Sequence, residues 1–96
     1  MNIPVNNPAI KSICNEENIV YLGIFGSQAR GEAKPSSDVD ILVDFDQPKS
    51  FFQLARIKEK LEKVFNNRVD LVLRTNIKEQ LKPHIMHDLI TLYGQG

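Results

Sequence analysis

Apolar residues recur along the chain with two spacings, one typical of strands and the other of helices. Short apolar runs rich in Val, Ile and Leu predict three buried strands: residues 19–25 (IVYLGIF), 39–45 (VDILVDF) and 68–73 (RVDLVL). Apolar residues at helical spacing predict three helices: residues 8–15, 50–65 and 77–93. With a single helical turn over residues 27–31, the predicted order is α-β-α-β-α-β-α. We therefore expect an α/β fold, with a small mixed sheet of three to four strands flanked by helices.

Several element ends carry sequence signals of their own. Ser50 and Gln53 form the pattern of a capping box at the start of the predicted helix over residues 50–65, and Asn66 follows the last apolar residue of this helix. In the short helical turn, we expect Ser27 as the N-terminal cap and Gly31 as the terminating residue. Residues 32–37 (EAKPSS) are expected to form a loop.

The last predicted helix contains a proline and two histidines. Either this helix begins near Leu81 with Pro83 in its first turn, or Pro83 kinks a longer helix. His84 and His87 lie one turn apart, followed by Asp88, and could form a metal site, but no further ligand at a suitable spacing is evident. We interpret the two histidines as surface or partner-contact residues.

The composition is that of a small globular protein. Of the 96 residues, 42% are apolar and 25% are charged, enough for one modest core. We expect a single domain over residues 1–96, without room for a second, substrate-binding domain. Cys14 is the only cysteine, which excludes an internal disulfide and fits a reducing compartment. The sequence lacks a signal-peptide pattern and an apolar stretch of ~20 residues, so we expect a cytoplasmic protein without a membrane span.

The net charge is zero, but the two halves of the chain differ in sign. Residues 1–48 carry three basic and seven acidic side chains, or −4, whereas residues 49–96 carry nine basic and five acidic ones, or +4. The predicted helix over residues 50–65 carries four basic residues: Arg56, Lys58, Lys60 and Lys63. They form either the solvated face of this helix, which we favour, or a surface for a polyanion. This balance does not require nucleic acid as a partner.

Three aspartates interrupt the apolar pattern of two predicted strands. Residues two apart in a strand point to the same face, so Asp38 and Asp40 project side by side, roughly 7 Å apart along the backbone. If the third strand pairs beside the second, Asp70 joins them. Carboxylates placed together disfavour each other's ionisation unless a cation is present. Their oxygen atoms, without His or Cys nearby, suit Mg²⁺ or Mn²⁺.

A glycine-serine turn precedes the aspartates. Gly26 and Ser27 end an apolar strand and open a helical turn, where free backbone N–H groups favour a phosphate. Gly26 permits a close approach of the backbone, the Ser27 hydroxyl adds a donor, and Arg30 can face the same anion. Carboxylates facing a phosphate-binding turn are typical of two-metal phosphoryl or nucleotidyl transfer. The residues alone do not indicate which group accepts the nucleotide.

The complete motif resembles that of a known family. Residues 26–31 (GSQARG) followed by residues 37–40 (SDVD) are similar to the signature of the minimal nucleotidyltransferases of the DNA polymerase beta superfamily. Asp70 stands where that family carries its third carboxylate, and residues 81–94 (LKPHIMHDLITLYG) resemble its C-terminal helix.

The resemblance implies an enzyme and assigns roles to individual residues. It implies metal binding by Asp38, Asp40 and Asp70, with two Mg²⁺ ions as cofactors and ATP as substrate. It further implies nucleotide binding at the glycine-serine turn and at the start of the second strand: Gly26, Ser27, Arg30 and Ser37. Such minimal proteins are typically encoded beside a helical HEPN ribonuclease toxin. Members of the family act as antitoxins that transfer AMP from ATP to a tyrosine of that toxin.

Two other functions stay open at this point. The domain could neutralise a partner by stoichiometric binding alone, without catalysis. It could also transfer a nucleotide to a small molecule such as an aminoglycoside, in which case a homodimer would have to supply the second wall of the acceptor site. Template-directed polymerisation is disfavoured because the chain has no strongly basic groove.

Overall fold

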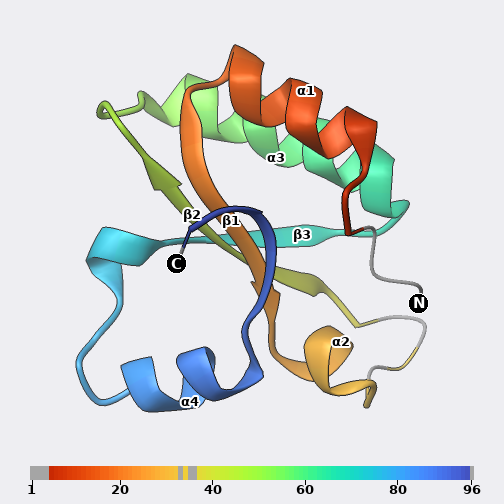
Figure 1. Cartoon of the computed structure of the whole chain (residues 1–96), viewed down its shortest axis with the longest axis vertical. Helices are drawn as coiled ribbons and strands as arrows, with labels where there is room; N and C mark the ends of the chain where they lie inside the picture. Colours follow the sequence, from red (N-terminus) through yellow and green to blue (C-terminus); the bar gives the residue numbers. More distant parts are fainter. Residues whose placement is uncertain (1–4, 33, 35–36, 96) are drawn as a thin grey trace.

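The computed structural model describes residues 5–32, 34 and 37–95, and the following statements concern these residues. They form four α-helices, four strands and one 3₁₀ helix in this order: α1 (Pro8–Glu16), β1 (Ile19–Phe25), α2 (Ser27–Arg30), β2 (Val39–Phe45), α3 (Phe51–Phe65), β3 (Val69–Leu73), η1 (Arg74–Asn76), α4 (Lys82–Asp88) and β4 (Ile90–Gly94). The strands make one sheet in the order β3-β2-β1-β4. β1 is antiparallel to β2 and β4, whereas β2 and β3 are parallel, so the sheet is mixed (Figure 1).

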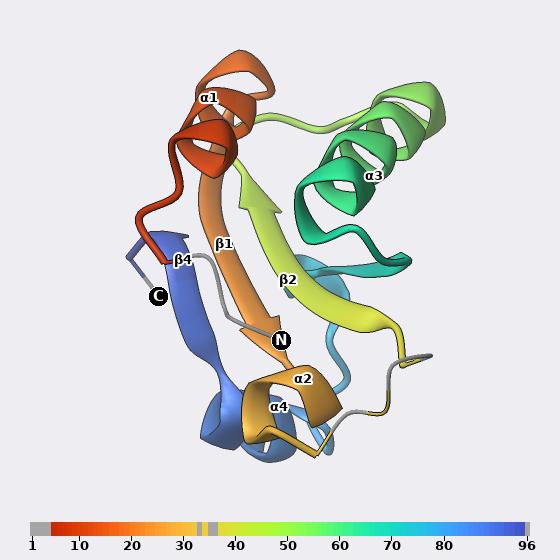
Figure 2. The ribbon, with the colours of Figure 1, turned by 90° about the vertical axis from the view of Figure 1, so that its right-hand side faces the viewer.

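The core lies between the sheet and the helix pair α1 and α3 (Figure 2). Alternate residues of β2, namely Val39, Ile41 and Val43, enter this core together with the apolar stripes of the two helices. The alternation of a strand turns the intervening residues, Asp40 among them, to the opposite face. The short helices α2 and α4 lie together at the end of the sheet where β1 ends (Figures 1 and 2). No helix within the described ranges is long and apolar enough to cross a membrane.

Most of the predicted elements are confirmed. The first two predicted strands have the bounds of β1 and β2, and β3 pairs beside β2 as the carboxylate hypothesis requires. Ser50 and Gln53 form the expected capping box, with Ser50 Oγ accepting from Gln53 N at 3.1 Å and Gln53 Oε1 accepting from Ser50 N at 2.7 Å. The predicted loop over residues 32–37 lies partly outside the described residues.

Two local predictions are wrong. The N-terminal cap of α2 is Gly26, so Ser27 is already the first helical residue, while Gly31 ends the helix in the left-handed conformation as expected. The helix predicted over residues 77–93 is helical only from Lys82 to Asp88. Pro83 lies in its first turn, which confirms the first of the two alternatives for this proline.

The remainder of that segment forms the edge strand β4. The spacing of Ile85, Leu89 and Leu92 suits a helix, but the backbone from Ile90 pairs instead with the outer edge of β1. Tyr21 Oη and Thr91 Oγ1 lie 2.9 Å apart across this pair. The strand is formed because pairing satisfies backbone groups of β1 that would otherwise be unpaired at the sheet edge.

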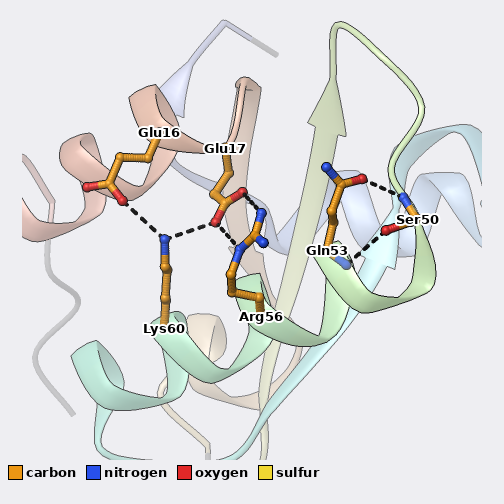
Figure 3. A network of polar contacts seen from close by, with 6 residues as sticks. All are labelled: Glu16, Glu17, Ser50, Gln53, Arg56 and Lys60. Carbon is orange, nitrogen blue, oxygen red and sulfur yellow. Dashed lines mark hydrogen bonds and ion pairs between the residues drawn. The ribbon is translucent and has the colours of Figure 1, made fainter.

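A buried carboxylate joins α1 to α3 (Figure 3). Glu17, only 2% exposed, accepts hydrogen bonds from Arg56 Nε and Nη2 at 2.8 and 2.7 Å and from Lys60 Nζ at 2.9 Å. The hydrogen bonds from Arg56, followed by those from Lys60, outweigh the effect of burial and lower the pKa of Glu17 from 4.5 to about 2. The interpretation of the basic residues of α3 as a purely solvated face is therefore wrong for Arg56 and Lys60.

We expect Glu17→Gln to destabilise the protein in a pH-dependent manner. The folded-state pKa is depressed, so the ionised carboxylate stabilises the fold fully above pH 4.5, and this contribution is lost as the pH falls from 4.5 towards 2. Urea unfolding at pH 7 should show a loss of about 2–3 kcal/mol, since hydrogen bonds to charged groups contribute about that much.

Glu16→Gln is the matched control for this variant. Glu16 accepts from the same Lys60 Nζ at 3.1 Å but is 58% exposed, so its replacement should change stability far less. Equal losses for the two variants, or a loss for Glu17→Gln that does not shrink towards pH 2, would contradict the role assigned to Glu17.

Candidate active site

Strand pairing brings two of the three predicted carboxylates together. Asp40 in β2 is registered with Phe25 of the antiparallel β1 on one side and with Asp70 of the parallel β3 on the other. Registered residues of neighbouring strands share a face and lie about 4.8 Å apart in the hydrogen-bonding direction. Asp40 and Asp70 are therefore direct neighbours on the face of the sheet opposite α1 and α3.

Gly26 brings the backbone against the Asp40 carboxylate. This residue has a φ of 78°, in the left-handed region that favours glycine, and it turns the chain from β1 into α2. A Cβ atom at this position would collide with Asp40 Oδ2. Both the conformation and the lack of a side chain are thus required for the turn to contact the carboxylate.

The electrostatic surroundings of Asp40 disfavour its ionisation. Burial raises the pKa of Asp40, and the charges of Asp70 and then Asp38 raise it further, whereas the charge of Arg30 acts in the opposite direction. The charges of Asp70 and Asp38 thus both act on Asp40 at this end of the sheet. Two neighbouring carboxylates without a compensating cation fit the oxygen-rich donor set of a hard divalent ion.

Asp38 is turned towards another partner. It precedes β2, its side chain is 48% exposed, and its Oδ1 lies 3.2 Å from Arg68 Nε, itself 79% exposed. Among the described residues, no three His, Cys, Asp or Glu side chains are arranged to hold a metal ion. An ion pair this exposed is weak.

Ser37 anchors the loop that leads into β2. Its carbonyl oxygen accepts from Gln28 Nε2 at 3.2 Å and from Asn67 Nδ2 at 2.8 Å, and its hydroxyl accepts from Lys34 N at 3.0 Å. Sequence reasoning missed Gln28 and Asn67 in this role. The sequence carries no signal for this role, because Gln28 stands in a predicted helical turn and Asn67 also fits the end of α3.

Arg30 is held by two acidic side chains. Its Nη1 donates to Asp88 Oδ2 at 2.7 Å and its Nε to Glu32 Oε2 at 3.1 Å. Asp88 is the last residue of α4, so this contact joins α2 to α4. Sequence reasoning placed Asp88 only beside the two histidines and did not connect it with Arg30.

A hollow of ≈ 390 Å³ opens beside the carboxylates. The sheet contributes Phe25, Asp40, Asp70 and Val72, and the segment from η1 to α4 contributes the opposite wall: Asn76, Ile77, Lys78, Leu81, His84 and Ile85. His84 lines this hollow, whereas His87 Nδ1 lies 3.3 Å from Asp88 Oδ1. The site thus combines a carboxylate pair, a tight glycine turn and a mostly apolar recess.

This combination agrees with the comparisons with known proteins. The family model described as "Polymerase beta, Nucleotidyltransferase" matches residues 8–95. The chain belongs to this family. Membership makes it a nucleotidyltransferase, with a nucleotide as the substrate.

Relatives of similar size support the same assignment. Protein adenylyltransferase MntA of Thermococcus cleftensis is 41% identical over 69 residues, which cover 72% of this chain and 70% of the relative. A relative from Methanocaldococcus jannaschii is 38% identical over 90 residues, which cover 94% of this chain and 97% of the relative. It is named as a candidate protein adenylyltransferase.

Solved structures share the fold of this nucleotidyltransferase. One described as a candidate minimal nucleotidyltransferase is 35% identical, with a TM-score of 0.73 and coverage of 85% of this chain and 84% of its own. A toxin-antitoxin structure with AMP-PNP has a TM-score of 0.76 at 22% identity, covering 95% and 75% of the two chains. The structure of a tri-AMPylated Shewanella oneidensis HEPN toxin in complex with an MNT antitoxin has a TM-score of 0.65 at 19% identity, with coverage of 90% of this chain and 67% of the matched chain. At these lower identities the likeness concerns the fold.

We expect Gly26→Ala to disrupt the site far more than the fold. The Gly26 backbone, with φ 78° and ψ −156°, costs about 1–3 kcal/mol for alanine, and the added methyl group must displace the Asp40 carboxylate. Because that carboxylate can rotate away, most of the effect should appear as loss of nucleotide transfer. Urea unfolding and a transfer assay measure the two effects separately.

Gly31→Ala is the matched control. Gly31 also has a positive φ, of 73°, but a Cβ atom there meets nothing within 4 Å. Its ψ of 18° lies in the αL region, which alanine tolerates better than the ψ of −156° at Gly26, so Gly31→Ala should lose less stability and keep its activity. Equal activity of the two alanine variants would contradict the role of the contact between Gly26 and Asp40.

Proposed function

We propose that this nucleotidyltransferase is an antitoxin that transfers AMP from ATP to a tyrosine of a cognate HEPN ribonuclease toxin. The observation that carries the proposal is the registered pair Asp40 and Asp70 beside the Gly26 turn. The two relatives of this chain described above are named as protein adenylyltransferases. The fold is shared with an antitoxin in complex with an AMPylated toxin, which supports the choice of partner.

The proposed site residues have distinct roles. Asp38, Asp40 and Asp70 hold Mg²⁺, which when bound stabilises the phosphate charge and activates the attacking hydroxyl. Gly26, Ser27 and Arg30 bind the triphosphate, and Ser37 supports the nucleotide through the loop that it anchors. Asp38 joins the set by leaving its exposed contact with Arg68.

The reaction joins the partner's hydroxyl to the nucleotide. The tyrosine oxygen forms a bond to the α-phosphorus of ATP, the bond from that phosphorus to the bridging oxygen breaks, and pyrophosphate leaves with the electron pair. The hydroxyl proton passes to solvent. Asp70 lies on an edge strand and is exposed, so a hydroxyl carried by another protein can reach this carboxylate without opening the sheet.

The experiment that tests this proposal combines the purified protein, its cognate toxin, Mg²⁺ and radiolabelled ATP. Label should appear on a toxin tyrosine. Asp40→Asn should lower the rate at least about 100-fold, because it removes a proposed metal ligand. Asp44→Asn is the matched control: Asp44 lies on the same strand and face but pairs with Arg74 at 3.8 Å, away from Gly26.

The same mixture separates catalysis from masking. Complete inhibition of the toxin at an equimolar ratio without nucleotide would contradict catalytic neutralisation and favour stoichiometric binding. Asp38→Ala/Asp40→Ala protein that labels and neutralises as well as the wild type would likewise overturn the proposed function. Label on an aminoglycoside but not on the toxin would favour the small-molecule transferase.

A further inference from the structure

The contact between Arg30 and Asp88 is the one ion pair described between the two short helices that border the candidate site. Arg30 is the last residue of α2 and Asp88 the last of α4, 58 positions further along the chain. The distance from Arg30 Nη1 to Asp88 Oδ2 is 2.7 Å, as expected for a charge-assisted hydrogen bond. It fixes the guanidinium group relative to the wall of the hollow.

The burial of Asp88 separates this contact from ordinary surface pairs. The Asp88 side chain is 14% exposed, whereas Glu32, the second partner of Arg30, is 66% exposed. The hydrogen bond from Arg30, followed by that from His87, lowers the pKa of Asp88. Asp88 therefore holds Arg30 more firmly than Glu32 does.

Arg30 has a competing attraction towards the catalytic carboxylates. Arg30 N donates to Gly26 O at 3.1 Å, and Gly26 lies against the Asp40 carboxylate, so the positive charge of Arg30 is close to these carboxylates. Without Asp88, the guanidinium would be drawn towards these carboxylates, where it would occupy the place of a cation. Within the part of the chain that the structure describes, two of the five N–H donors of Arg30 contact Asp88 and Glu32, and the other three have no described side-chain acceptor.

We propose that Asp88 is a positioning residue for nucleotide binding: it holds Arg30 beside α4, so that the remaining N–H donors face the triphosphate and stay off Asp40. The inference rests on the proposed function, because it requires a nucleotide at Gly26 and Ser27. Asp88 itself touches neither nucleotide nor acceptor. It acts through Arg30 alone.

The test compares Asp88→Asn, Asp88→Glu, Arg30→Gln and the double variant Arg30→Gln/Asp88→Asn. Binding of a fluorescent, non-hydrolysable ATP analogue is titrated with Mg²⁺ present, and KM and kcat are measured on the toxin. Asp88→Asn should weaken analogue binding and raise KM for ATP about 10-fold, as expected for loss of a hydrogen bond between charged groups. KM for the toxin should stay unchanged. Asp88→Glu should recover most of the affinity.

The double variant distinguishes positioning from general stability. If Asp88 acts through Arg30, the double variant should bind the analogue as weakly as Arg30→Gln and no more weakly. Glu79→Gln, which removes the exposed pair with Lys82 at 3.2 Å next to α4, is the control and should bind like the wild type. A thermal unfolding scan of each variant reports any change in stability.

Four results would overturn the inference. Asp88→Asn protein that is less stable but binds the analogue normally would make the contact a structural tie only. Additive losses in the double variant would show that Asp88 acts independently of Arg30. A wild-type protein that binds no ATP analogue would overturn the proposed function and this inference together. If the wild type labels the toxin normally and the Asp88→Asn variant binds the analogue as well as the wild type, this inference alone is overturned.

Discussion

The register of β2 between its two neighbours is the constraint on which the site depends. β2 is antiparallel to β1 and parallel to β3, and both pairings meet at Asp40. A shift by one residue would turn every side chain of β2 to the other face. Asp40 would then enter the core beside α1 and α3, and Val39 and Ile41 would leave it. Burial of these apolar residues therefore determines where the carboxylate points.

The helix α3 determines whether Asp70 reaches Asp40 at all. Parallel strands require a crossover connection, and α3 is that connection between β2 and β3. Ile57, Leu61 and Phe65 bury its apolar side, and Glu17 binds its polar side through Arg56 and Lys60 (Figure 3). A carboxylate network on the far face of the sheet thus supports the geometry of the site without contacting it.

Local sequence patterns were sufficient for the elements that form the site. The apolar runs of β1 and β2, the capping box at Ser50 and the position of Asp70 in a third strand could all be predicted, because each depends on neighbouring residues. Contacts between distant residues could not be. Glu17 and Arg56 are 39 positions apart, and Arg30 and Asp88 are 58 apart. The strand β4 was missed because its apolar spacing suits a helix, and only the open edge of β1 decides otherwise.

The distribution of charge explains why the site needs something from outside the chain. Among the described residues, the arginines closest in sequence to the site pair with acids other than Asp40 and Asp70. Arg30 pairs with Asp88 and Glu32, and Arg68 pairs with Asp38. Arg56 and Lys60 of α3 bind Glu17 on the opposite face of the sheet. Asp40 and Asp70 are consequently left with an excess of negative charge, which burial makes more costly. A fold that assigned Arg30 to these carboxylates would leave no place for the cation that we propose at this site.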